Sequence, residues 1–218
     1  MKRPLRNNSL ALAAFGLFLA FLSIQSVTGS REYNEDQREH GEETLGYVEY
    51  LGTGHFKESV FENWESEFLQ MGGFVLLTVF LRQKGSPESK KVEGPDDVDA
   101  EPDPGAEGAP APVRRGGLAL ALYQNSLSIV LLSLFVLSLL LHAAGGAEEY
   151  GEEQEAHGQP RVSVAAYMTT ARFWHESMQN WQSEFLAVGA LVVLSVFLRQ
   201  KGSPESKPLD HPHSETGG

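Results

Sequence analysis

Four apolar segments interrupt a chain that is otherwise polar, acidic and rich in glycine and proline. They cover residues 10–27, 68–81, 127–144 and 185–198. A helix rises about 1.5 Å per residue, so about 20 residues cross the hydrocarbon core of a bilayer. The first and third segments approach that length. The pattern therefore predicts an all-α membrane protein.

The second and fourth segments are shorter, with 14 mainly apolar residues each. Extending them back to Trp64 and Trp181 gives 18 residues each. Indole rings favour the headgroup level and basic side chains reach out to it, so a Trp at one end and a basic pair at the other form an anchor pattern. The basic anchors are Arg82, Lys84, Arg199 and Lys201. We therefore expect four transmembrane helices, at about residues 10–28, 64–82, 122–144 and 181–199.

The sequence also repeats itself at an offset of 117 residues. RQKGSPESK occupies residues 82–90 and again 199–207, and 22 of the 35 positions from 56 to 90 match their counterparts. The offset holds without a gap back to Asn8–Ser9 and Asn125–Ser126. Because each copy has an even number of spans, this predicts two tandem parallel two-span repeats, over residues 1–90 and 116–207.

The segments outside the two copies differ in composition. Residues 91–115 are rich in proline, glycine and acids, which is typical of a disordered linker. Residues 208–218 are interpreted as a flexible C-terminal tail.

The distribution of basic residues predicts the orientation. If all four segments cross, 12 of the 17 Lys and Arg residues lie on one side of the membrane. The positive-inside rule then places both termini in the cytoplasm. An alternative for the first segment is a cleaved signal peptide, because Lys2, Arg3 and Arg6 precede it. The matching segment in the middle of the chain favours a span.

Composition argues against several function classes. A net charge of −12 disfavours nucleic acid as a partner, since phosphate binding needs clustered Lys and Arg. The chain has no cysteine, which excludes disulfides, thiolate metal sites and a Cys nucleophile. No nucleotide-binding loop, HExxH motif or nucleophile elbow occurs. We therefore expect no enzyme activity, no cofactor and no bound metal.

The candidate site lies where the even-numbered spans begin, in NWESEFL at 63–69 and NWQSEFL at 180–186. On a helix, a residue and its fourth successor share a face. A carboxylate at the edge of hydrocarbon is costly unless it is paired or hydrated. One interpretation is a cation or proton site near the outer face, and the other is a set of polar residues in the headgroup region. The cluster comprises Asn63, Trp64, Ser66, Glu67, Asn180, Trp181, Ser183 and Glu184.

The histidines do not form a convincing site in the sequence. His55 and His175 do not occupy matching positions under the offset, so they are interpreted as surface residues. His211 and His213 offer only two ligands on a proline-rich tail.

The motif GSPESK follows both even-numbered spans. Its proline cannot continue a helix, so the spans are predicted to end near Gly85 and Gly202. The motif is interpreted either as a helix stop with a basic anchor or as a cytoplasmic docking surface.

The run NWxSEFL, an apolar stretch and FLRQKGSPESK together resemble an uncharacterised family of small bacterial membrane proteins, classed as a domain of unknown function. The resemblance covers nearly the whole chain. It implies a bacterial inner-membrane location and brings no activity, substrate or catalytic residue with it.

Two functions are compatible with these features. The first is a structural or accessory membrane protein whose loops bind partners, because its spans are largely apolar all round. The second is a small transporter or channel, completed by dimerisation, with a cation or proton site near the outer face. The expected partners are the lipid bilayer and a membrane protein or a second copy of the chain.

Overall fold

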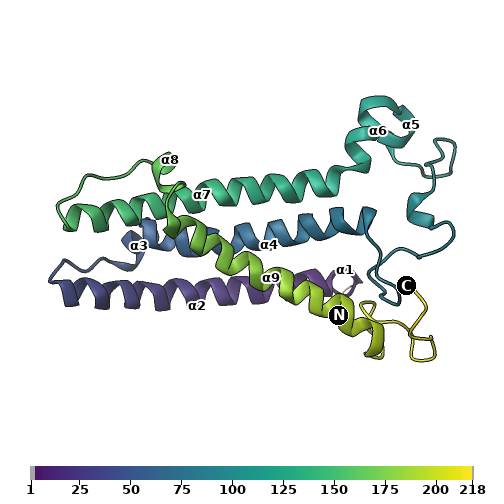
Figure 1. Ribbon diagram of the computed structural model, residues 1–218, viewed down its shortest axis with the longest axis horizontal. Helices are drawn as coiled ribbons and strands as arrows, with labels where there is room; N and C mark the ends of the chain where they lie inside the picture. The colour runs from purple at the N-terminus through teal and green to yellow at the C-terminus, as the bar shows by residue number, and fades with distance from the viewer. Residues whose placement is uncertain (1–2, 218) are drawn as a thin grey trace. The chain divides into compact units, whose positions relative to one another are not determined.

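The computed structural model describes residues 3–217, and within this range every regular element is helical (Figure 1). The all-helical prediction is confirmed for these residues. The elements are α1 (Arg3–Asn7), α2 (Ser9–His40), α3 (Tyr47–Tyr50), α4 (Gly54–Phe80), the 3-10 helix η1 (Asp97–Asp99), α5 (Ala111–Arg115), α6 (Gly117–Gln124), α7 (Ser126–Ala156), α8 (Val164–Tyr167) and α9 (Ala171–Phe197).

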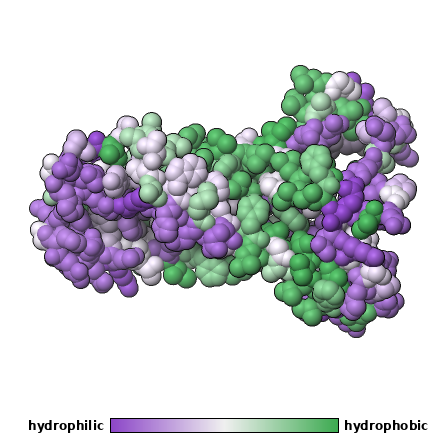
Figure 2. Space-filling model, viewed as in Figure 1, coloured by the Kyte–Doolittle hydropathy of each residue, from purple (hydrophilic) through white to green (hydrophobic). Residues whose placement is uncertain are grey.

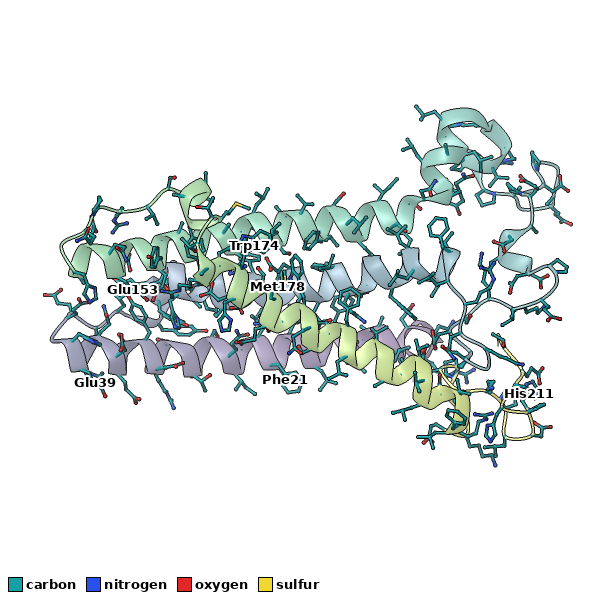
Figure 3. The ribbon with its side chains drawn as sticks, in the orientation of Figure 1. Phe21, Glu39, Glu153, Trp174, Met178 and His211 are labelled. Atoms are coloured by element: carbon teal, nitrogen blue, oxygen red, sulfur yellow. The ribbon has the colours of Figure 1, made fainter. Side chains whose placement is uncertain are left out.

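Three of the described helices, α2, α7 and α9, are long and apolar enough to cross a membrane. Large apolar side chains of α2 are exposed: Leu10 is 83% exposed, Phe15 is 68% exposed, and Phe21, labelled in Figure 3, is 65% exposed. The helix α4 does not reach the same apolar character, because it carries Glu65, Glu67 and Gln70 near its middle. Length and composition thus identify a helical protein with three candidate membrane spans.

The long helices extend well past the apolar segments. The first predicted span ends near residue 28, but α2 continues to His40. The third was expected to begin near residue 122, but α7 begins at Ser126, because Asn125 leaves helical geometry with φ −110° and ψ 6°. The two shorter helices end at Phe80 and Phe197, slightly before the predicted span ends.

The chain divides into two compact units. Unit 1 comprises residues 1–61 and 141–173, and unit 2 comprises residues 62–140 and 174–218. Adding 117 to the bounds of α3 and α4 gives the bounds of α8 and α9. The segment predicted as a linker, 91–115, contains η1 and α5.

In unit 1, the first turns of α4 touch α7 backbone to backbone. A Cβ added to Gly145 would lie 2.6 Å from the amide nitrogen of Glu58, and one added to Gly54 would lie 2.7 Å from the carbonyl oxygen of Gly145. Beside this contact, Lys57 Nζ donates a hydrogen bond to Glu148 at 2.7 Å. Only glycine allows two helices to approach so closely.

Unit 1 also contains two buried tyrosines that pack in the same way. Tyr50 and Tyr167 are 1% and 0% exposed. A Cβ on Gly29 would lie 2.3 Å from the hydroxyl of Tyr50, and one on Gly146 would lie 2.5 Å from the hydroxyl of Tyr167. Each ring therefore sits against a glycine of the preceding long helix.

The turn that follows each tyrosine is built from equivalent residues. Thr53 donates to the carbonyl of Tyr50, and Thr170 donates to the carbonyl of Tyr167, both at 2.7 Å. Each threonine hydroxyl then accepts a hydrogen bond from the backbone amide three residues later, and so caps the start of the next helix.

Unit 2 is packed mainly by apolar contacts. Gly72 of α4 lies against Leu132 of α7, because a Cβ added to Gly72 would lie 3.1 Å from Cδ2 of Leu132. Phe135 of α7 and Trp181 of α9 make an edge-to-face ring contact with centroids 5.8 Å apart.

In space-filling view, hydrophilic residues cover the end of unit 1 where α2 and α7 stop (Figure 2).

We predict that Gly145→Ala destabilises the protein by about 1–3 kcal/mol, because the added methyl group forces the backbones of α4 and α7 apart. Thermal unfolding of the purified protein in detergent measures the effect. Gly16→Ala is the matched control, since nothing lies within 4 Å of its Cβ position. In a helix interior that change is expected to be neutral or slightly stabilising. Equal melting temperatures for the two variants would contradict the close helix contact.

Candidate functional site

The residues of the predicted cluster lie on α4 and α9 within unit 2. Trp181 Nε1 donates a hydrogen bond to Glu65 Oε1 at 3.1 Å, and Asn180 Nδ2 donates to Glu62 Oε1. Glu65 is fully buried. The structure therefore joins the two halves of the cluster, but through Glu62 and Glu65 rather than through the carboxylates singled out in the sequence.

The other members of the cluster have local roles. Ser66 Oγ and Ser183 Oγ each donate to the carbonyl three residues earlier, on Asn63 and Asn180, at 2.8 Å. Glu67 is exposed and lies within electrostatic range of Glu184. Trp174 and Trp181 of α9 pack edge to face at 6.4 Å. This arrangement makes a polar seam between α4 and α9, held by one indole and one amide.

The basic anchors cap the ends of α4 and α9. Arg199 donates to the carbonyls of Ser195, Val196 and Leu198, at distances from 2.9 to 3.2 Å. Arg82 donates to the carbonyl of Phe80 at 3.1 Å. These bonds satisfy carbonyl groups that have no partner within the helix. Lys84 and Lys201 follow in the turns after the helices.

Both GSPESK motifs fold into the same turn. Ser89 accepts a hydrogen bond from the amide of Gln83 at 2.8 Å, and Ser206 accepts one from Gln200 at 2.9 Å. Gly85 and Gly202 have φ values of 88° and 87°, which favour glycine. The motif is thus a folded helix stop.

The two turns also approach each other within unit 2. Burial raises the pKa of Glu88, and a hydrogen bond with the carboxyl group of Glu205 and its charge raise it further. Residues after the second turn, predicted as a flexible tail, contact the first turn, since Thr216 accepts from the amide of Gly85 at 2.8 Å. Gly217 donates to the carbonyl of Ser86 at 3.1 Å.

A second polar cluster lies in unit 1, which we call the head cluster, comprising Glu58, His142 and Tyr167. Tyr167 donates a hydrogen bond to Glu58 Oε1 at 2.8 Å. A ligand nitrogen of His142 and a carboxylate oxygen of Glu58 lie within 4.8 Å. All three side chains are buried, with His142 and Tyr167 at 0% exposure. The ring of His142 stacks on Phe173 with centroids 5.0 Å apart.

Unit 1 also contains a small acidic cavity of about 300 Å³. His55 lines it, and its Nδ1 atom lies 3.2 Å from the hydroxyl of Tyr50. Burial lowers the pKa of His55, against the opposing attraction of Glu32 and Asp36. The cavity is lined by Glu32, Tyr33, Glu35, Asp36, Glu39, His55 and Glu149.

Glu149 connects the cavity to the head cluster electrostatically. Burial, followed by the negative charges of Glu58 and Glu152, raises its pKa to about 7. Its Oε2 atom has no hydrogen-bond partner among the described residues. Glu149 therefore exchanges a proton near neutral pH, beyond the end of the apolar segment of α7.

The chemistry available to unit 1 is proton binding and transfer. A carboxyl group, an imidazole and a phenol lie close together in the buried head cluster, and none of these groups was placed in the predicted site. One sequence signal existed: His142 is a polar residue near the end of an apolar segment, and Gln25 occupies the matching position of the first segment. The partners Glu58 and Tyr167 had no comparable signal, because they lie outside the apolar segments.

The model for Domain of unknown function (DUF6766) matches residues 1–218. No curated protein and no solved structure matches the chain.

We predict that Glu149→Gln changes how stability depends on pH. Because the folded state raises the pKa of this acid from 4.5 to about 7, it binds the proton more tightly than the unfolded chain does. The contribution of Glu149 to the free energy of unfolding is therefore most favourable below pH 4.5 and is lost as the pH rises through 7. After a discount for the part of the side chain that meets solvent, we expect a loss of about 1–2 kcal/mol.

Thermal unfolding in detergent at pH 5 and pH 8 tests this. The Gln variant should melt like the wild type at pH 5 and higher than the wild type at pH 8. Glu43→Gln, at an exposed position after α2, is the control and should leave both melting temperatures unchanged. A Glu149→Gln variant that tracks the wild type at both pH values would contradict the raised pKa.

Proposed function

The chain belongs to DUF6766, a family of unknown function, and we propose that it is a structural or accessory protein of the bacterial inner membrane. It spans the membrane four times as two tandem parallel two-span repeats, with both termini in the cytoplasm. The observation that carries the proposal is the outward-facing apolar surface of α2, α7 and α9. Such helices are solvated by lipid, and not by water.

Helix α4 supplies the fourth span. Its bounds match those of α9 at the offset of 117 residues, and both helices are followed by the same basic turn. From Phe68 to Phe80 its only polar side chains are Gln70 and Thr78. Thr78 donates to the carbonyl of Val75 at 2.9 Å, which lowers the cost of its hydroxyl in lipid.

The outer end of unit 1 supports a partner-binding role. The ends of α2 and α7 line an open groove of about 730 Å³, in which acids outnumber bases. Glu39 and Glu153 mark this acidic end on the two helices (Figure 3). An acidic groove suits a partner with basic side chains, because opposite potentials favour association.

A second candidate function is proton movement, and the head cluster favours it. Asp, Glu and His side chains form proton relays in membrane pumps and transporters. Here a buried carboxylate accepts a hydrogen bond from a phenol and lies close to an imidazole. Glu58 and His142 stand in this relation, and Glu149 titrates near neutral pH. This candidate requires proton flux, which the structural or accessory function does not.

The topology is tested by cysteine labelling, which is clean because the chain has no natural cysteine. The four labelling positions are exposed in the structure, so the reagent can reach each of them. Cysteines at Glu43 and Gln159 should react with an impermeant maleimide only from outside the cell. Cysteines at Glu93 and Glu205 should react only in inverted vesicles. Labelling of the Glu93 cysteine from outside, with the Glu43 result unchanged, would show that α4 does not cross.

Proteoliposomes containing a pH-sensitive dye separate the two functions. With a potassium gradient and valinomycin driving protons inward, the structural function predicts acidification at the rate of empty liposomes. The second candidate predicts a faster rate that Glu58→Gln abolishes and that Glu43→Gln leaves intact. A protein-dependent rate would overturn the structural function as the complete account.

A further inference from the structure

A pair of short helices precedes α7 within unit 2. Helix α5 packs against α6, and Val113 of α5 is buried. The two helices are joined by Gly116 and Gly117, with φ values of 64° and 55°, a backbone conformation that favours glycine. The chain therefore reverses at this point for a local structural reason, and residues 111–124 form a compact hairpin.

This hairpin does not extend α7 in a straight line. The helix breaks at Asn125, whose side-chain amide donates to the carbonyl of Ala121 at 2.8 Å. Ser126 Oγ donates to the carbonyl of Tyr123 at 2.7 Å. These two bonds satisfy the carbonyl groups at the end of α6, so the break is built into the sequence. Figure 1 shows α6 running at an angle to α7.

The same break occurs before α2. Asn8 has φ −116° and ψ 18°, close to the −110° and 6° of Asn125. Ser9 Oγ donates to the carbonyl of Arg6 at 3.0 Å, as Ser126 does in the second case. Both long helices are thus preceded by a short helical segment that leaves their axis at an Asn-Ser pair.

The exposed surface of the hairpin combines apolar and basic side chains. Leu118 and Leu122 are four residues apart, share one face of α6 and are 75% and 53% exposed. Tyr123 is 46% exposed beside them. Arg114 and Arg115 are exposed at the end of α5, and no Asp or Glu occurs between residues 108 and 147. In a chain of net charge −12, this stretch is locally basic.

We propose that residues 111–124 lie on the cytoplasmic face of the membrane and bind anionic phospholipids. The leucines enter the boundary between headgroups and acyl chains, the tyrosine sits at headgroup level, and the arginines bind lipid phosphates. Charge complementarity identifies the occupant as the anionic leaflet. The inference rests on the four-span topology, which places this hairpin in the cytoplasm.

The apolar segment of α7 makes a transmembrane role for α6 unnecessary. Residues 127–144 alone supply 18 residues, or about 27 Å of helix. A straight extension would carry the leucines of α6 out of the hydrocarbon and into water. Lying along the surface keeps them in contact with lipid.

Site-directed fluorescence on the full-length protein in nanodiscs tests the proposal. Single cysteines from residue 118 to residue 123 are labelled with an environment-sensitive dye, in discs of phosphatidylcholine with and without phosphatidylglycerol. In discs that contain phosphatidylglycerol, labels at Leu118 and Leu122 should emit at shorter wavelength than a label in water, and iodide should quench them less. A label at Leu209, which is 62% exposed in the tail, is the aqueous control.

The double variant Arg114→Gln, Arg115→Gln tests the anionic headgroup. Two arginines near an anionic surface should change partitioning onto it by about tenfold or more. In the double variant, iodide should quench the labels at Leu118 and Leu122 in discs with phosphatidylglycerol as strongly as it does in discs of phosphatidylcholine alone. Both arginines are exposed, so folding should be preserved and thermal unfolding confirms it.

Three results would overturn the proposal. Labels at Leu118 and Leu122 as accessible as the Leu209 label would show that the hairpin is in water. A smooth gradient of quenching from residue 118 to 123, without helical periodicity, would show that α6 continues the axis of α7. Equal quenching of the wild-type protein and the double variant in anionic discs would show that the two arginines do not bind the headgroups. Maleimide labelling at Glu93 tests the topology separately, so a wrong topology and an unbound hairpin can be told apart.

Discussion

Close contact between the backbones of α4 and α7 controls the polar chemistry of unit 1. Gly54 and Gly145 have no side chains, so the first turns of α4 lie directly on α7. This proximity brings Lys57 to Glu148 and holds the backbone of Glu58 against the helix that carries His142. A buried polar network is stable only when its groups meet their partners, so these hydrogen bonds and charges depend on the glycine contact.

The two buried tyrosines show how one packing arrangement serves two chemistries. Tyr50 and Tyr167 each press against a glycine and each precede a threonine cap. Their hydroxyl groups nevertheless meet different partners, His55 in one case and Glu58 in the other. Under the proposed duplication the scaffold was kept while the groups facing the hydroxyls diverged.

The position of His55 corresponds to that of Arg172 at the offset of 117 residues. The guanidinium of Arg172 lies 5.6 Å from the ring centre of Tyr150, and the ring of His55 lies 5.5 Å from that of Tyr33. A permanently charged group thus stands in one copy where a titratable group stands in the other. Burial lowers the pKa of His55 and raises that of Glu149 to about 7, so unit 1 holds two titratable groups whose pKa values are shifted by burial.

The approximate positions of the long helices could be predicted from the sequence. A long apolar run flanked by Trp, Arg or Lys is typical of a helix in or near lipid, where backbone groups must bond within the segment. The sequence did not indicate how far α2 and α7 continue, since their polar ends carry no apolar pattern. It pointed to Asn63 and Glu67 where the structure uses Glu62 and Glu65 toward α9. The rotation of one helix against its neighbour decides which face is buried, and no single helix encodes it. The head cluster likewise depends on tertiary structure, because Glu58, His142 and Tyr167 come from three separate parts of the chain.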